Sequence, residues 1–374
     1  MKIGIDISDL NDSQRTGIAV YIYELLNELI RLDQDDEFIL FGIATFKTHN
    51  YLKNLDFKKY PNVKLKIMRW PARLFRQTFI AWQKFNFPPI EKLIGSIDIF
   101  HSFNWYLPPT KSAKSVGTFF DMTAITNPEW HLAKTTQMDK LLFKRMSKLN
   151  DVVITISGAS KKDFLNYSPK SRVEVIYPAA AKIFNPAVNK NLNKKILDKY
   201  NLKSGFILSV STLEPRKNLE GLIKAYLNLK TDAKLVLVGK SGWKNQELER
   251  LIERYKDKII SLGFVPENEL PTLYQEAVFL IYPSFYEGFG IPILEAMSCG
   301  TPVIISNNSS MPEVGGEAAV YIDPYKTESM TKVMNLFLSD KKLLEKHRRL
   351  VLVQAKKFSW EVSAKKLIKL YKQI

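Results

Sequence analysis

Two glutamates, Glu287 and Glu295, flank a glycine-rich turn in the stretch PSFYEGFGIPILEAMSCGTPVI, residues 283–304. The apolar run before them predicts a strand that ends near Pro283. Pro292 suits the first turn of a helix, where its missing N–H costs no hydrogen bond. Glycines let a backbone approach a ligand closely, and the free N–H groups of a helix start favour a phosphate. The segment therefore predicts an anion-binding turn with a carboxylate on each side.

The spacing of these glutamates argues against a hydrolytic pair. Retaining glycosidases hold their two carboxyl groups about 5 Å apart across one bond. Eight residues of helix rise about 12 Å and turn away from the starting face. The spacing better fits two contacts on different parts of a long ligand. Spacing alone leaves a second interpretation open, in which one acid caps the helix and the other is a solvated helix residue.

A pair of adjacent cations, Arg216 and Lys217, follows a predicted strand in the segment STLEPRKNLEGLIKAY, residues 211–226. A guanidinium forms forked hydrogen bonds and an ammonium acts as a point charge, so the pair suits a diphosphate. An ordinary solvated loop is the alternative.

Gly17, in RTGIAVY after the first predicted strand, could bring backbone N–H groups to a phosphate. It is not part of a G-x-G-x-x-G motif, so no dinucleotide is indicated.

The elements that must position these residues alternate between strand-like and helix-like segments, which predicts α/β domains with parallel sheets. In such doubly wound sheets ligands bind at the carboxyl ends of the strands. We therefore expect two Rossmann-like domains with a cleft between them. The clearest expected strands in each half are residues 2–7, 37–43, 63–68 and 151–157, and then 205–212, 234–240, 259–265, 278–284, 302–307 and 318–324.

The length of 374 residues also favours two domains, because it exceeds what one ordinary hydrophobic core supports. The polar stretch 184–202 is the least ordered connection, and we place the boundary there. The expected division is a first domain at 1–186 and a second at 187–355, which the family resemblance described below makes the acceptor-binding and the nucleotide-sugar-binding domain. A C-terminal helix at 356–374 is expected to return to the first domain.

The net charge of +17 favours polyanions or anionic membrane surfaces as partners. No nucleic-acid-binding motif supports a specific nucleic acid. The single cysteine, Cys299, lies in an apolar stretch and is expected to be a small core residue. One cysteine excludes a disulfide framework, and we find neither a signal peptide nor an apolar run that could span a bilayer. A cytoplasmic protein, peripheral on the inner face of the cell membrane, is the expectation.

The segment MRWPARLFRQTFIAWQKFNF, residues 68–87, combines four basic residues with aromatic residues at helical spacing. A basic amphipathic helix of this kind suits an anionic bilayer surface. The alternative is a core-facing helix with a solvated charged side. The aromatic and basic residues concerned are Arg69, Trp70, Arg73, Phe75, Arg76, Phe79, Trp82, Lys84 and Phe85.

The chain resembles the group 1 (family 4) retaining glycosyltransferases, whose members have two facing Rossmann-like domains in the GT-B arrangement. The resemblance is strongest over residues 282–324 and extends to 211–226, 262–277 and 358–371. It implies that Glu287 contacts hydroxyls of the donor sugar and that Glu295 holds the ribose. It further implies that Arg216 and Lys217 bind the diphosphate and stabilise it as it leaves.

The resemblance also implies that backbone N–H groups contact the donor sugar and phosphate and that apolar residues surround the nucleotide base. The residues that match these family positions are Phe289, Gly290 and Ile291 near the sugar and phosphate, Gly17 in the glycine loop, and Val265 and Leu270 around the base.

One family element departs from the common pattern. Asp121, in FFDMT, aligns with the acidic residue near the point of transfer, but Phe120 stands where many members have a histidine. His101 or His131 could take that histidine's role, or the role is not needed. A purely structural loop residue is the alternative for Asp121. His49 and His347 are expected on the surface.

The expected activity is retaining transfer of a hexose from a nucleotide-diphosphate sugar to a glycan or lipid-linked acceptor in cell-surface polysaccharide biosynthesis. GDP-mannose is the favoured donor and UDP-hexoses are the alternative. A nucleotide-sugar epimerase or phosphorylase of the same fold, and a non-enzymatic polyanion-binding protein, are the competing classes. No cofactor or metal is expected, because basic residues can replace a divalent cation. The Asp-Gln-Asp run at 33–35 only superficially resembles a metal-binding D-x-D motif.

Overall fold

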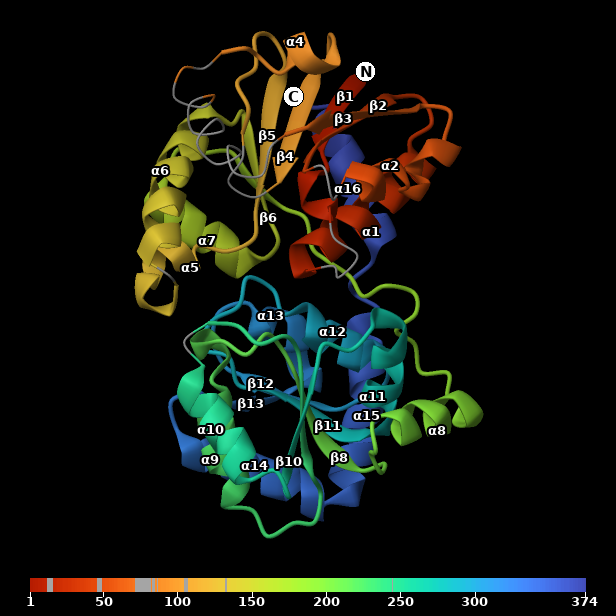
Figure 1. Ribbon diagram of the computed structural model, residues 1–374, viewed down its shortest axis with the longest axis vertical. Helices are drawn as coiled ribbons and strands as arrows, with labels where there is room; N and C mark the ends of the chain where they lie inside the picture. The colour runs from red at the N-terminus through yellow and green to blue at the C-terminus, as the bar shows by residue number, and fades with distance from the viewer. Residues whose placement is uncertain are drawn as a thin grey trace. The chain divides into compact units, whose positions relative to one another are not determined.

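The structure is a computed structural model that describes residues 1–11, 16–45, 49–70, 82, 85, 87–103, 107–131, 133–243 and 245–374. The chain folds into two compact units, and each is an α/β domain with a parallel sheet (Figure 1). Unit 1 comprises residues 1–178 together with 360–374, and unit 2 comprises residues 179–359. The divisions fall at residues 178 and 359, against the expected 186 and 355.

Unit 1 contains a seven-stranded parallel sheet in the order β3-β2-β1-β4-β5-β6-β7. The order reverses beside β1, which pairs with β2 through Gly4 and Ile39 and with β4 through Gly4 and Phe100. Helices cover both faces of such a sheet, so its inner strands are largely buried, whereas the edge strand β3 alternates in exposure and carries Lys64 and Lys66. The strands are β1 Lys2–Asp6, β2 Glu37–Ala44, β3 Val63–Arg69, β4 Ile99–Phe103, β5 Lys114–Phe119, β6 Val152–Thr155 and β7 Val173–Val175.

The first helix of unit 1 begins at Gly17, where the Thr16 side chain accepts a hydrogen bond from the N–H of Ala19. The last helix of the chain, α16, packs along α1 within this unit (Figure 1). The Ser363 hydroxyl donates to the carbonyl of Tyr177 at 2.6 Å. The helices of unit 1 are α1 Gly17–Leu32, α2 His49–Lys53, α4 Glu91–Ile94, α5 Thr123–Thr126, α6 Ala133–Leu149, α7 Gly158–Tyr167 and α16 Trp360–Tyr371.

Unit 2 contains a six-stranded parallel sheet in the order β10-β9-β8-β11-β12-β13. Here the order reverses beside β8, which pairs with β9 on one side and β11 on the other. The loops that follow β8 and β11 therefore leave the sheet side by side, at the place where doubly wound folds bind ligands. The strands are β8 Phe206–Val210, β9 Leu235–Val238, β10 Ile259–Gly263, β11 Ala277–Tyr282, β12 Val303–Ser306 and β13 Val320–Ile322.

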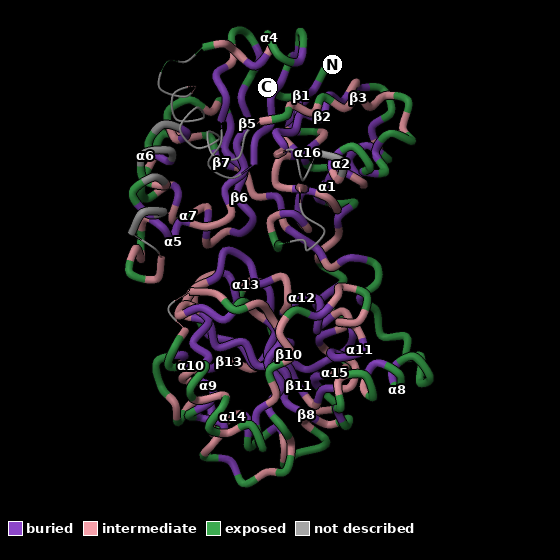
Figure 2. Tube along the Cα trace, in the orientation of Figure 1, coloured by how far each residue is buried: buried purple, intermediate pink, exposed green. Residues whose placement is uncertain are grey.

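Helices lie on both faces of the second sheet, with α9, α10 and α14 on one side and α11, α12 and α15 on the other (Figure 1). The strands between them are buried (Figure 2). Cys299 is buried directly after α12, and burial raises the pKa of its thiol. The helices of unit 2 are α8 Lys190–Lys199, α9 Leu219–Leu227, α10 Gln246–Arg254, α11 Leu270–Glu276, α12 Ile291–Ser298, α13 Met311–Gly315, α14 Thr327–Ser339 and α15 Lys341–Ala355.

Most of the segment expected to dock on a membrane lies outside the described residues. Of its aromatic residues, Trp70 and Trp82 pack against the core cluster that contains Phe41 and Phe100. Phe85 is exposed. Membrane docking stays a prediction. Within the described part of the chain, no helix has both the length and the apolar composition needed to cross a bilayer.

The packing of α16 on α1 predicts a stability effect. Leu367 is 1% exposed, so Leu367→Ala removes apolar contacts from the core of unit 1 and should lower the free energy of unfolding by about 2–5 kcal/mol. Urea denaturation measures this change. Lys366→Ala on the exposed face of the same helix is the matched control. Equal midpoints for the two variants would contradict the packing described here.

Candidate active site

The cations predicted from the sequence lie at the reversal of the second sheet. Arg216 and Lys217 are in a short 3-10 helix, η4 (Pro215–Lys217), in the loop that follows β8. The loop that follows β11 carries Glu287. The N–H of Phe285 donates to the carbonyl of Arg216 at 2.9 Å and joins the two loops directly. Strand order thus brings together residues about 70 positions apart in sequence.

Glu287 bridges both cations. One carboxylate oxygen, Oε2, accepts from Arg216 Nη1 at 2.9 Å, and the other, Oε1, accepts from Lys217 Nζ at 2.6 Å. The remaining donors of Arg216 are directed at Glu214, through Nε and Nη2 at 3.2 and 2.8 Å. Its Nη1 also donates to the carbonyl of Tyr286 at 2.9 Å, and Lys217 donates to the Tyr282 hydroxyl at 3.1 Å. Two cations and two carboxylates therefore form one charge-balanced cluster.

Burial sets the electrostatics of this cluster. The side chains of Glu287 and Lys217 are 7% and 9% exposed. Burial acts to raise the pKa of Glu287, but the charges of Arg216 and Lys217 outweigh it and hold that pKa at about 2. Burial and the neighbouring Arg216 lower the pKa of Lys217. Glu287 is therefore an ionised acceptor of hydrogen bonds, and it has no proton to donate as a general acid at neutral pH.

A turn follows Glu287, as the sequence predicted, and it includes the left-handed backbone conformation that glycine adopts readily. Gly290 has φ +100°, a left-handed conformation, and a Cβ there would lie 2.8 Å from the side chain of Ile293. Helix α12 begins at Ile291 with Pro292 in its first turn. The backbone N–H of Ile291 belongs to the first-turn donors that have no acceptor within their own helix. Phe289 is 2% exposed and packs on Phe358, so its contribution to a ligand is limited to its backbone.

A third loop, after β12, holds the Glu287 loop in place. The Asn308 side chain donates to the carbonyl of Phe285 at 3.0 Å, and the N–H of Glu287 donates to the Ser309 hydroxyl at 3.1 Å. The Ser310 hydroxyl is 2.9 Å from the carbonyl oxygens of both Glu287 and Phe289. The sequence analysis assigned no role to these residues or to Glu214. The sequence does contain a sign of Asn308, Ser309 and Ser310, because they form a polar run directly after the buried strand β12, whose end lies at the same edge of the sheet as the ends of β8 and β11.

Glu295 lies apart from the cationic cluster, on α12 against α11. It is 8% exposed, and its Oε2 accepts from the Tyr274 hydroxyl at 2.8 Å. Burial and the charge of Glu267 raise the pKa of Glu295 to about 7, against the effect of the Tyr274 hydrogen bond. Val265 is buried in the loop after β10 and Leu270 begins α11. These three residues are therefore placed on the α11 side of unit 2.

Two predicted site residues belong to unit 1. Gly17 is the exposed first residue of α1. Asp121 accepts hydrogen bonds from the N–H and the hydroxyl of Thr123, at 2.9 and 2.6 Å, and so fixes the start of α5. This contact gives Asp121 the loop-stabilising role that the sequence analysis left open. His131 is near it, because its Nε2 lies 3.0 Å from the Thr123 hydroxyl.

His101 and His347 are core residues. His101 is fully buried, and its two ring nitrogens contact the hydroxyls of Tyr371 and Thr118 at 2.5 and 2.7 Å. Burial lowers its pKa to about 3, so it is a neutral packing residue. The surface position expected for His347 is wrong, since this side chain is 7% exposed and contacts the carbonyl of Ala318. Phe120, at the family histidine position, packs on Tyr21.

Two α/β domains, with a charge-balanced cationic site at the sheet reversal of the second, define a GT-B glycosyltransferase, and comparison with known proteins agrees. A family model described as "Glycosyl transferases group 1" matches residues 192–358, and one described as "Glycosyltransferase Family 4" matches residues 15–180. An Escherichia coli protein named O-antigen chain mannosyltransferase B is 33% identical over 381 residues, which cover 96% of each chain. The chain belongs to the group 1 glycosyltransferases.

Solved structures agree on the fold. Sucrose-phosphate synthase from Thermosynechococcus elongatus is 19% identical, with a TM-score of 0.78 over 100% of this chain and 98% of the other. HepE from Anabaena, solved in complex with UDP and glucose, is 18% identical, with a TM-score of 0.72 over 100% of both chains. The expected fold class, two Rossmann-like α/β domains of the GT-B class, is confirmed.

The bridging position of Glu287 predicts that its charge stabilises the ligand-free protein. Glu287→Gln leaves the buried Lys217 and the partly buried Arg216 without their shared counter-ion and should lower the free energy of unfolding by about 3–5 kcal/mol at neutral pH. Urea denaturation tests this. Glu253→Gln is the control, because Glu253 pairs with Lys256 on the exposed surface of the same unit, and its midpoint should not move. A Glu287→Gln midpoint equal to that of the control would refute the counter-ion role.

The raised pKa of Glu295 predicts a pH-dependent stability term. Its folded-state pKa of about 7 exceeds its ordinary 4.5, so the folded protein holds a proton that the unfolded chain releases between these values. Wild-type stability should therefore fall, relative to Glu295→Gln, as the pH rises from 5 to 8, by on the order of 2–3 kcal/mol. Denaturation of both proteins at several pH values measures the difference. A constant difference would show that Glu295 titrates normally.

Proposed function

We propose that this protein transfers mannose from GDP-mannose, with retention of anomeric configuration, to a glycan or lipid-linked acceptor in cell-surface polysaccharide biosynthesis. The observation that carries the proposal is the pair of cations, buried Lys217 and partly buried Arg216, at the sheet reversal of a group 1 glycosyltransferase. The name of the E. coli relative, which matches the chain over 96% of its length, supports mannose as the sugar. UDP-hexoses remain the alternative donors.

In the proposed reaction, the bond between the anomeric carbon and the diphosphate oxygen breaks and its electron pair passes to that oxygen. Fixed cations favour this step, because the growing negative charge is stabilised more in the transition state than in the ground state. Lys217 uses two of its three N–H donors on Tyr282 and Glu287 among the residues described, which leaves one for a phosphate oxygen. The first-turn N–H groups of α12 would add to this stabilisation.

The acceptor hydroxyl would attack from the same face, and its proton would pass to the departing phosphate. The electrostatics of Glu287 support this assignment, because a carboxylate with a pKa of about 2, held by two cations, is poorly suited to act as an acid or a nucleophile. Glu287 would instead accept hydrogen bonds from sugar hydroxyls and keep both cations in place. Glu295 would accept hydrogen bonds from the ribose of the donor. Asp121, near the point of transfer, and Gly17, in the glycine loop, would contribute to the site from unit 1.

The proposal needs no divalent cation, since Arg216 and Lys217 would balance the diphosphate charge. Membership in the group 1 glycosyltransferases supports glycosyl transfer over an epimerase reaction. A phosphorylase of the same fold stays the alternative from that class. Binding to an anionic membrane surface and action at the cytoplasmic face remain predictions from the composition and from residues 68–87.

Donor choice and metal independence can be tested in one assay. We expect the full-length protein to turn over GDP-mannose in preference to UDP-, ADP- and dTDP-hexoses, at a rate that EDTA leaves unchanged. Lys217→Ala should lower kcat by about 10²–10³-fold, because it removes a donor to the developing charge. Nucleotide release, with and without an excess of EDTA, measures both effects.

Arg250→Ala is the control, because this exposed arginine in unit 2 pairs with Glu247 at the surface. It should retain full activity. Preferred turnover of a UDP-sugar would replace the proposed donor. Loss of activity in EDTA that Mg²⁺ restores would overturn the metal-free reaction, and full activity of a folded Lys217→Ala would overturn the role of the cations.

A further inference from the structure

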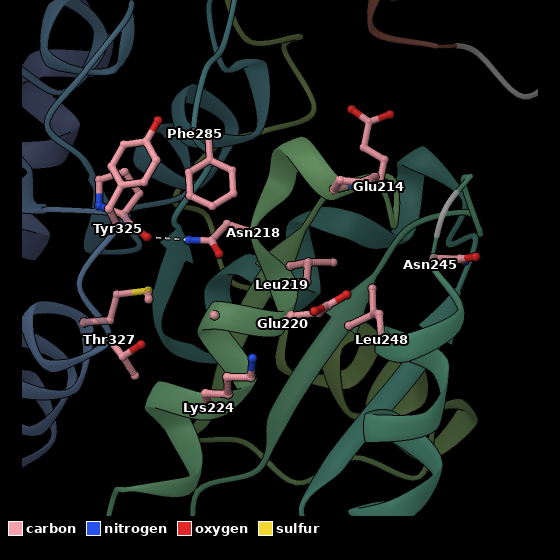
Figure 3. A pocket seen from close by; sticks show the side chains of 14 residues that line it. Glu214, Asn218, Leu219, Glu220, Lys224, Asn245, Leu248, Phe285, Tyr325 and Thr327 are labelled. Atoms are coloured by element: carbon pink, nitrogen blue, oxygen red, sulfur yellow. Dashed lines mark hydrogen bonds between the residues drawn. The ribbon is translucent and has the colours of Figure 1, made fainter. Parts of the chain in front are cut away.

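A cavity in unit 2 lies next to the cationic cluster, and apart from Glu214 and Phe285 its lining residues have no role in the candidate active site. It measures about 390 Å³, within the range of small-molecule sites, and lies among the first turns of α9, the start of α14 and the loop after β13 (Figure 3). Its lining includes the apolar residues Leu219, Leu248 and Met330, polar side chains of α9, and Asn245 directly before α10. The cavity has room for one or two sugar rings.

Asn218 fixes the walls of this cavity. Its side-chain amide donates to the carbonyl of Pro283 at 3.2 Å and to that of Pro324 at 2.7 Å, so it joins the loops after β11 and β13 to the start of α9. Its backbone is left-handed, with φ +54°. Gly221 faces its Oδ1, and a Cβ at Gly221 would lie 2.3 Å from that atom. The start of α9 is therefore built tightly around a fixed asparagine.

An aromatic pair lines one side of the cavity. The rings of Phe285 and Tyr325 are stacked, with centroids 4.9 Å apart and planes 26° from parallel, and Figure 3 shows both beside Asn218. Tyr325 is 70% exposed. A large aromatic side chain left open to solvent next to a cavity offers a flat apolar surface. The C–H face of a pyranose ring is flat and apolar in the same way.

The charges around the cavity nearly balance. The carboxylate of Glu214 is already engaged by the Arg216 guanidinium. Glu220 and Lys224 carry opposite charges one helical turn apart on α9 and both line the cavity. A phosphate-rich ligand would meet two carboxylates and one lysine, which disfavours a nucleotide. Carboxylate, ammonium and amide groups that surround an apolar floor suit the hydroxyls of a neutral polyol.

We propose that this cavity binds a carbohydrate chain, a segment of the glycan that the enzyme elongates, with one sugar ring packed on Tyr325. The identity of the ligand rests on the proposed function. The cavity shares two residues with the candidate active site, since Glu214 holds Arg216 and the N–H of Phe285 donates to the carbonyl of Arg216. A glycan held here is retained next to the cationic cluster between successive transfers.

The test is a binding titration of the full-length protein, without nucleotide, using manno-oligosaccharides of one to five residues. We expect affinity to rise with chain length and then level off. Tyr325→Ala should weaken binding of the longest oligosaccharide about tenfold or more, because the stacking surface is lost. Tyr325→Phe keeps the ring and should bind as the wild type does.

Tyr167→Ala is the matched control, because Tyr167 is also an exposed tyrosine packed on a phenylalanine, Phe143, but lies in unit 1. Its oligosaccharide affinity should equal that of the wild type. Unchanged binding by Tyr325→Ala would overturn the proposal, as would equal affinity for mannose and the pentasaccharide. Displacement of the oligosaccharide by GDP would also overturn it, because the cavity would then belong to the donor site.

Donor turnover measured on the same wild-type preparation separates this proposal from the proposed function. Turnover of GDP-mannose without binding of any oligosaccharide overturns the cavity proposal alone. Oligosaccharide binding that depends on Tyr325, in a protein that turns over no donor, supports the carbohydrate site and overturns the proposed function.

Discussion

The ion cluster around Glu287 is the interaction on which the candidate site depends. Arg216 and Lys217 are neighbours on one loop, and the Glu287 carboxylate of a second loop is the acidic partner of the buried Lys217 and a shared partner of Arg216. That carboxylate is within reach only because β8 lies between β9 and β11, where the strand order reverses. Sheet topology and local charge balance are therefore one constraint. A change in either would separate the cations from their counter-ion.

The same cluster explains why two neighbouring cations are stable in the ligand-free protein. Two carboxylates balance the two cations, and Arg216 also donates a hydrogen bond to the backbone carbonyl of Tyr286. In the proposed reaction, a diphosphate would meet donors that are already oriented and would replace some of their acceptors. Such preorganisation spares the protein from rearranging its dipoles as charge develops. Glu295 differs because it has no cation, and burial gives it a raised pKa.

Much of this could be predicted from the sequence because it depends on local pattern. Buried strands of parallel sheets are continuous apolar runs, and Gly290 with Pro292 marks a turn and a helix start. The roles of Glu214 and Ser309 could not be predicted, because they depend on which loops the fold places side by side. The burial of His101 and His347 could not be predicted for the same reason, because their hydrogen-bond partners lie far away in the sequence, up to 270 residues in the case of His101 and Tyr371. Alignment with a family position could not reveal that Asp121 also accepts a hydrogen bond from Thr123, and its role near the point of transfer stays a prediction.

The position of α16 gives the chain an unusual order of assembly. Unit 1 begins at the first residue but takes its final helix from residues 360–374, so its core stays open while a ribosome is still making the rest of the polypeptide. Unit 2 is contiguous and can fold as soon as it emerges. Domains synthesised first commonly fold first, but here the residues of unit 2 are complete before those of unit 1. A truncation before residue 360 would therefore remove a helix from the unit that contains residues 1–178.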